Sequence, residues 1–174
     1  QELILAERFL SVRDRYEHLL RQGLMAATSY DVILLDCPPS LGPVTRSALT
    51  AANLLIIPSQ CEYFSAHALR DMLELVRSIR QRTNPRLRYR VLLTMIDRRN
   101  RIHRSLEAQV RQAFSQAVFQ PAIEIDTRLR ESPVFGQPIT VYAPTSRGAQ
   151  QYRQLAQEMR QYVQESTRSA AQSA

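Results

Sequence analysis

Four short stretches of the sequence are apolar, without the alternation that marks a half-exposed strand. They cover residues 32–35, 54–57, 91–96 and, less completely, 122–125. Pro38 and Pro58 stop the first two. An unbroken apolar run of this length is typical of a strand buried on both faces of a parallel sheet. We therefore predict four buried strands.

The segments between these runs carry apolar residues at helical spacing, which predicts amphipathic helices. These helices are expected over residues 9–24, 44–52, 69–79, 102–114 and 149–163. Strands that alternate with helices form right-handed crossover units in a parallel sheet. The expected fold class is α/β, a mostly parallel sheet with helices on both faces.

The chain has 174 residues, a length typical of one domain. We expect a single α/β domain over residues 1–165 and a frayed tail over 166–174, which is rich in Ser, Ala, Thr and Gln. No apolar stretch is long enough to span a membrane, and no signal peptide is expected. Cys37 and Cys61 match neither a disulfide framework nor a metal-ligand spacing, which fits a reducing cytoplasm.

The formal net charge is +7, and every one of the 23 basic residues is arginine. Seven arginines fall between Arg86 and Arg104, where Asp97 is the one acid. Clustered arginines make bidentate contacts to phosphates and bind DNA without reading its sequence. A solvated helix start is the alternative interpretation of this cluster.

The most informative motif joins the first apolar run to Asp36 and a Cys-Pro-Pro-Ser-Leu-Gly turn that ends at Gly42. Ligands of open α/β sheets bind at the carboxyl ends of the strands. An aspartate held there can bind Mg²⁺, directly or through water, beside the phosphates of a nucleotide. An aspartate that merely caps the following turn is the alternative.

The sequence resembles the ParA/MinD-type partition ATPases in five segments that follow the same order. The turn after Asp36, with the segment behind it, is similar to the Walker B and switch region of that family. This first segment comprises residues 36–42 and 45–49, and the other four are residues 57–63, 92–99, 127–139 and 144–149.

The resemblance implies binding of ATP and Mg²⁺. It places Asp36 at the catalytic Mg²⁺ site and implies nucleotide contacts from Asp36, Pro38, Pro39, Asp97 and Asp126. It also implies non-specific DNA binding, because Arg99 and Arg128 resemble DNA-contacting positions of the family. The full set of predicted DNA-binding residues is Arg98, Arg99, Arg101, Arg104, Arg128 and Arg130, expected on one face.

The family's properties further imply a homodimer in the ATP state, a stimulating ParB-like partner, and a cytoplasmic, nucleoid-associated protein. Membrane attachment is not expected, because the Ala/Ser/Gln-rich tail offers no Phe, Leu or Trp for insertion.

The sequence departs from the family in two places. A phosphate-binding loop needs several glycines and a lysine, whereas this chain has four dispersed glycines and no lysine. We therefore expect the family's ATP hydrolysis to be absent from this chain alone, with the loop supplied by residues upstream of Gln1. Residues 123–126 read Ile-Glu-Ile-Asp instead of the family's Ile-Pro-Arg-Asn, in a stretch from which the adenine pocket is built.

Two alternatives stay open. One is a pseudo-ATPase without a phosphate-binding loop that acts as a binding or dimerisation module. The other is a fragment of an enzyme of the cobyrinic acid diamide synthase type, which shares the nucleotide-binding fold.

Overall fold

The computed structural model describes residues 2–62 and 65–172. Tyr63 of the matching segment 57–63, and residues 173–174 of the predicted tail, lie outside this range. The chain forms two compact units. Unit 1 comprises Gln1–Leu55 and Ala66–Tyr89, and unit 2 comprises Ile56–Ser65 and Arg90–Ala174. The single domain over residues 1–165 stays a prediction.

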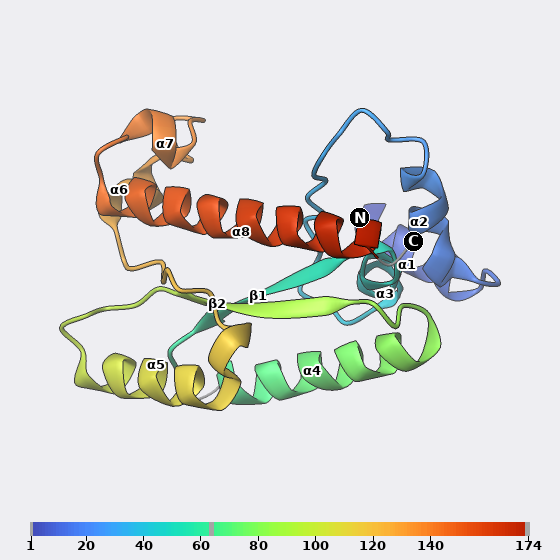
Figure 1. The fold of residues 1–174 in the computed structure, drawn as a ribbon, viewed down its shortest axis with the longest axis horizontal. Coiled ribbons are helices and arrows are strands. Elements are labelled where there is room, and N and C mark those ends of the chain that lie inside the picture. Colours follow the sequence, from blue (N-terminus) through green and yellow to red (C-terminus); the bar gives the residue numbers. More distant parts are fainter. Residues whose placement is uncertain (1, 63–64, 173–174) are drawn as a thin grey trace. The chain divides into compact units, whose positions relative to one another are not determined.

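Unit 1 is mostly helical. Its elements are α1 (Glu2–Ser11), the 3₁₀ turn η1 (Tyr16–His18), α2 (Leu19–Leu24), α3 (Pro43–Ala51) and α4 (Ser65–Arg82), whose first residue belongs to unit 2 (Figure 1). The predicted continuous helix over residues 9–24 is wrong, because α1 ends at Ser11 and the next helical turn, η1, begins only at Tyr16. Arg15 adopts a left-handed conformation there, with φ 56°, which ends any regular helix.

The core of unit 1 is formed by α3, α4 and the residue that precedes strand β2 (Arg88–Thr94). Its buried members are Leu49, Leu75, Val76, Ile79 and Leu87. The buried side chain of Asn84 fastens the end of α3, because its amide nitrogen donates to the carbonyls of Leu49 and Ala52 at 2.9 and 2.7 Å. These two bonds satisfy carbonyls that a helix end otherwise leaves unpaired.

Two strands pair directly: β1 (Leu54–Gln60) and β2 (Arg88–Thr94). Isolated parallel bridges add a third segment to β2, joining Val91 to Val118 and Ile96 to Glu124. The predicted strands at 54–57 and 91–96 are confirmed, and the weaker one at 122–125 is reduced to bridge pairing. The α/β class with a parallel sheet flanked by helices is confirmed.

The helices of unit 2 follow β2. They are α5 (Arg101–Phe114), the 3₁₀ turn η2 (Ser115–Ala117), α6 (Thr127–Glu131), α7 (Ile139–Tyr142) and α8 (Arg147–Gln172) (Figure 1). Leu92, Phe119, Ile123 and Leu155 form a buried cluster that joins the sheet to α8. Since α8 continues to Gln172, most of the predicted tail is helical, and its fraying stays a prediction.

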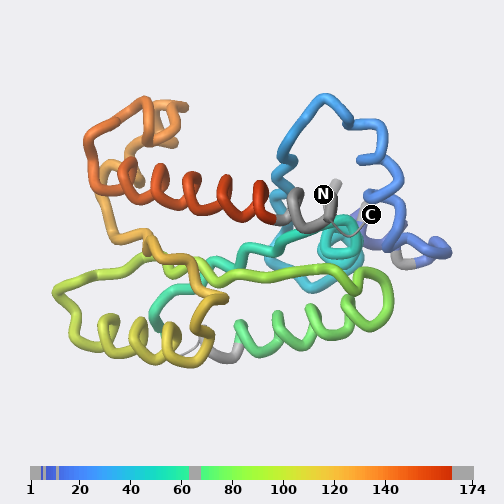
Figure 2. The backbone as a smooth tube through the Cα atoms, in the orientation of Figure 1, coloured from blue at the N-terminus to red at the C-terminus, as the bar shows by residue number. Residues whose placement is uncertain are grey.

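The predicted strand at 32–35 is absent from the structure. Residues 32–38 have no regular secondary structure, and the backbone between α2 and α3 runs as an open loop (Figure 2). Val32, Ile33 and Leu34 are 51%, 41% and 77% exposed. The physical reason is that a strand needs a hydrogen-bonded neighbour, and none among the described residues pairs with this segment.

Candidate functional site

The Asp36 turn belongs to unit 1 and is fixed by α3. Asp36 is exposed, and its carboxylate accepts no hydrogen bond from the part of the chain that the structure describes. Behind it, the buried hydroxyl of Thr45 donates to the carbonyl of Ser40 at 2.6 Å. Pro43 then opens α3 at the first helical turn, where a missing N–H costs nothing. The turn is therefore anchored while the carboxylate faces solvent.

Pro38 and Pro39 occupy the same turn, with Pro38 half-buried and Pro39 exposed. The pKa of the exposed Cys37 thiol is raised by partial burial and by the charge of Asp36. A raised pKa keeps this thiol protonated and unreactive at neutral pH.

Asp97 lies in unit 2, one residue after the bridge residue Ile96, in a closed turn. Its Oδ1 accepts the backbone N–H of Arg99 at 2.9 Å and the Arg99 Nε at 3.1 Å, and its Oδ2 accepts Nη2 of Arg99 at 3.1 Å. These bonds lower the pKa of Asp97. The backbone N–H of Asp97 donates to Nδ1 of His103 at 3.1 Å, so that nitrogen carries no proton.

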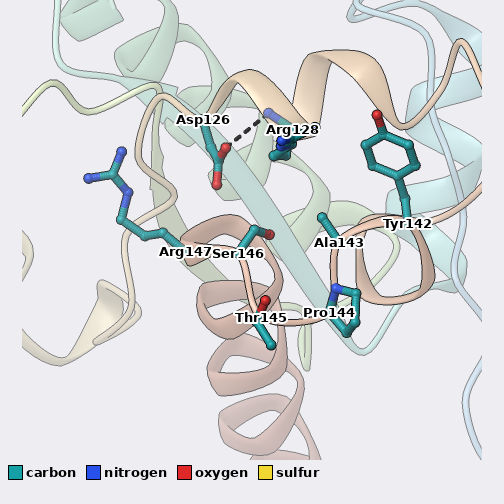
Figure 3. Close-up of a pocket in the computed structure, with 8 residues that line it drawn as sticks. All are labelled: Asp126, Arg128, Tyr142, Ala143, Pro144, Thr145, Ser146 and Arg147. Carbon is teal, nitrogen blue, oxygen red and sulfur yellow. Dashed lines mark hydrogen bonds between the residues drawn. The ribbon is translucent and has the colours of Figure 1, made fainter.

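Asp126 lies two residues after the bridge residue Glu124, and its carboxylate accepts hydrogen bonds from the first turns of two helices (Figure 3). Its Oδ1 accepts the Arg128 N–H at 2.9 Å and caps α6, and its Oδ2 accepts the Gly148 N–H at 2.8 Å, at the start of α8. A pocket of about 730 Å³ opens beside it, lined by Asp126, Arg128 and residues 142–147. Because Ile96 pairs in parallel with Glu124, Asp97 and Asp126 both lie at the carboxyl edge of unit 2.

A network of ion pairs, in which acidic and basic side chains alternate, lies beside this edge. Glu124 pairs with Arg98 at 3.0 Å and with Arg147 at 2.9 Å. Glu107 pairs with Arg98 and with Arg111, the latter at 3.0 Å. The side chains of Glu107 and Glu124 are only 11% and 12% exposed, so the arginines compensate nearly buried carboxylates.

Sequence reasoning missed this network. Glu107 lies in an amphipathic helix, where an acid is normally solvent-facing. The available signal was Glu124, a charged residue inside an apolar segment, which is stable only with a partner. The consequence is that Arg98, a predicted DNA contact, is committed to two carboxylates.

The other predicted arginines differ in how strongly they are held. Arg99 is bidentate to Asp97, yet its side chain is 92% exposed. Arg128 pairs with Glu131 at 3.0 Å, and Arg104 donates to the carbonyl of Arg98. Arg101 and Arg130 are exposed and make no ion pair within the described ranges. All six lie in unit 2, in or beside the two loops at its carboxyl edge.

The described residues form neither a cluster of metal ligands nor a membrane span. No group of three or more His, Cys, Asp or Glu side chains among them could hold a metal ion. None of the helices in this part of the chain is long and apolar enough to cross a membrane. The buried Cys61 has a raised pKa, chiefly because burial disfavours the thiolate.

Comparison with known proteins assigns the chain to a family. A family model described as an AAA domain matches residues 1–89. Chromosome-partitioning ATPase Soj of Thermus thermophilus is 44% identical over 137 residues, which are 78% of this chain and 55% of the relative. The chain belongs to the ParA/MinD-type partition ATPases.

Further members of this family show the same partial overlap. Sporulation initiation inhibitor protein Soj of Bacillus subtilis is 42% identical over 142 residues, 80% of this chain and 56% of the relative. The chain therefore spans about half the length of these curated relatives.

Solved structures agree on the fold. Cobyrinic acid a,c-diamide synthase from Mycobacterium smegmatis, with bound ADP and magnesium, matches with a TM-score of 0.74 at 30% identity, over 91% of this chain and 58% of that one. Apo McdA of Cyanothece matches with a TM-score of 0.73 over 88% and 65% of the two chains, and its 18% identity supports the fold alone.

Proposed function

We propose that residues 1–174 are the carboxyl-terminal part of a DNA-segregation ATPase that binds ATP·Mg²⁺ and coats DNA without sequence preference. The observation that carries the proposal is the 44% identity to a chromosome-partitioning ATPase over 78% of this chain. The network and turns at the carboxyl edge of unit 2 support it, because they position exposed arginines along that edge.

The nucleotide part of the proposal rests on Asp36. Its carboxylate is exposed and unengaged among the described residues, which suits a Mg²⁺ ion whose other ligands are phosphate and water. Asp36 would hold Mg²⁺ directly or through water, and Pro38 and Pro39 would shape the turn around the nucleotide. Asp97 and Asp126 are the proposed further nucleotide contacts. Mg²⁺ would neutralise charge on the phosphates during transfer.

Calorimetry with ATP·Mg²⁺ tests whether the chain needs a phosphate-binding loop from elsewhere. We expect no binding to residues 1–174, because the sequence has no lysine and no Gly-rich turn. Micromolar binding to this chain would overturn that requirement. In a chimera that joins the chain to the amino-terminal part of Bacillus subtilis Soj, ATP hydrolysis should appear and should fall on Asp36→Ala. A chimera that folds without hydrolysing ATP would favour the pseudo-ATPase alternative.

The DNA part of the proposal rests on the exposed arginines, of which Arg101 and Arg130 have no internal partner among the described residues. Each phosphate contact releases about one counterion, so affinity should fall steeply with salt. The variant Arg101→Ala/Arg130→Ala should weaken binding to every duplex alike and flatten the salt dependence by about one unit per lost contact. Arg160→Ala, which removes an exposed charge on α8, is the matched control. Equal affinity of the double variant and the parent across a salt series would overturn the assignment.

The remaining features of the proposal follow from the family. We propose a homodimer in the ATP state, stimulation by a ParB-like protein, and a cytoplasmic, nucleoid-associated protein. Light scattering of the chimera with and without ATP tests the dimer, and its ATPase rate with a ParB-like protein tests the stimulation.

A second candidate is supported by the likeness to cobyrinic acid a,c-diamide synthase at a TM-score of 0.74. A fragment of such an enzyme should bind the corrin substrate, whose visible absorption spectrum would report the contact. We expect the spectrum to be unchanged by the chain.

A further inference from the structure

Three exposed apolar side chains of unit 2 have no role in the proposed function, although Arg128 and Arg130 beside them are among its proposed DNA contacts. They are Val134, Phe135 and Val141, which are 82%, 62% and 62% exposed, and together they are called the Val134 patch. The three residues come from α7 and from the loop between α6 and α7. Isolated exposed hydrophobic residues are ordinary, whereas a contiguous group of them is typical of an interaction site. The stacking of Phe135 on Tyr142, the neighbour of Val141, places the loop residues against α7.

The loop that carries the patch is held by its own backbone. The N–H groups of Val134 and Phe135 donate to the carbonyls of Glu131 and Ser132 at 2.9 and 3.2 Å, and the Gln137 N–H donates to Ser132 at 3.1 Å. Gly136 supplies the positive φ of 63° that reverses the chain. Val134 and Phe135 are therefore displayed by a built turn.

An aromatic contact holds the Phe135 ring in place. The ring stacks on Tyr142 with the ring centroids 5.1 Å apart, and the Tyr142 hydroxyl donates to Glu131 at 3.0 Å. Glu131 also pairs with Arg128. This sequence of contacts connects the apolar surface to a guanidinium group.

A second arginine lies beside α7. Arg153 donates to the carbonyls of Pro144 and Thr140, and Thr140 precedes Val141. Arg130 is exposed on α6, with no ion pair in the described part of the chain. Glu131 is already paired with Arg128, so Arg130 and Arg153 leave an excess of positive charge beside the patch.

We propose that the Val134 patch is the docking site for a segment of a partner protein that presents apolar side chains flanked by aspartate or glutamate. Charge complementarity selects this occupant, because acidic groups beside apolar anchors would meet Arg128, Arg130 and Arg153. A second copy would set the same arginines against themselves in a two-fold contact. Nucleic acid would gain nothing from the two valines, and a membrane surface normally needs a longer amphipathic face than these three side chains.

The test selects peptides from a random library displayed on phage, using residues 1–174 as bait. We expect the enriched peptides to combine apolar and acidic residues and to bind as synthetic, fluorescently labelled copies. Val134→Ser/Phe135→Ser should weaken them about tenfold, the loss expected of a central anchor. Arg130→Glu should weaken them less and reduce their salt dependence. Ile102→Ser, which changes a 67% exposed residue on α5, should leave binding unchanged.

Circular dichroism checks that each variant is folded. If the double variant unfolds, Val134→Ser alone takes its place, since this side chain is the most exposed of the three. The proposal is overturned if no peptide is enriched, if the enriched peptides are basic, or if they bind the patch variants as well as the parent. It is also overturned if the patch variants abolish self-association in sedimentation, or abolish binding to vesicles containing phosphatidylserine.

Discussion

Two apolar runs of this chain look alike in sequence and differ in the structure. Residues 32–35 and 91–96 are each followed by an aspartate, Asp36 in unit 1 and Asp97 in unit 2. Val91 and Leu93 are fully buried in β2, which pairs with β1 and also accepts backbone hydrogen bonds from Phe119 and Ile123. Leu34, in contrast, is 77% exposed. An apolar run thus specifies a strand only where the chain also supplies its neighbours.

The two aspartates differ in the same way. Asp97 is bound by Arg99 and positioned by a backbone bond to His103. Asp36 accepts no hydrogen bond among the described residues, although the turn behind it is anchored by Thr45. A carboxylate that is satisfied internally stabilises a loop, and one that is not remains available to an external cation. The comparison favours Asp36 over Asp97 as the metal-binding group.

The largest expected effect comes from truncation within the buried run. Leu93→Ala removes a side chain with no exposed surface and should lower the free energy of unfolding by about 2–5 kcal/mol. Leu34→Ala, in the exposed run, should change it by less than about 0.5 kcal/mol. Urea unfolding of both variants is the measurement. Equal losses would mean that residues 32–35 are buried in solution and that the contrast between the runs is wrong.

A smaller effect is expected at the aspartate that joins α6 to α8. Asp126→Ala removes the cap of α6 and leaves the buried Gly148 N–H without its partner. The expected loss of unfolding free energy is about 1–3 kcal/mol. Asp36→Ala is the matched control and should be close to neutral for stability. A neutral Asp126→Ala would show that this double cap is not formed in solution.

The sequence predicted those parts of the fold whose stabilising contacts are local or repeated. The strands at β1 and β2 and the long helices were predicted because their apolar residues are buried against one another. The first helix was predicted as continuous because nothing in its spacing reveals the left-handed Arg15. The run at 32–35 was predicted as a strand because periodicity cannot tell whether a pairing neighbour is present.

The candidate site was predictable to a lesser extent. The motif drew attention to Asp36, but it placed this residue at the end of a strand that is absent from the structure. The two arginine loops were located relative to the sheet, because both follow segments that pair in it. The pairing of Arg98 with Glu107 and Glu124 was not predictable, since it joins residues 9 and 26 positions apart through the tertiary fold. Arginine count alone therefore overstates the charge available to a phosphate backbone at this surface.

The smallest expected effect concerns the dependence of stability on pH. The pKa of Asp97 is lowered in the folded state by its bonds to Arg99. A group with a lowered folded pKa contributes stability that is present above its unfolded pKa, about 3.9 for aspartate, and is lost as the pH falls through the folded value. Asp97→Asn should therefore lower the urea midpoint slightly near neutral pH, and this difference should shrink on acidification to about pH 3.

The control for this experiment is Asp36→Asn, which alters the aspartate after the other run. Because Asp36 accepts no hydrogen bond from the described residues, its replacement should leave the urea midpoint unchanged at both pH values. The Asp97–Arg99 pair is highly exposed on the arginine side, so salt should reduce the effect of Asp97→Asn further. If Asp36→Asn showed the pH-dependent difference and Asp97→Asn did not, the exposed aspartate would be the one engaged in solution. The assignment of Asp36 as the group left available for Mg²⁺ would then fail.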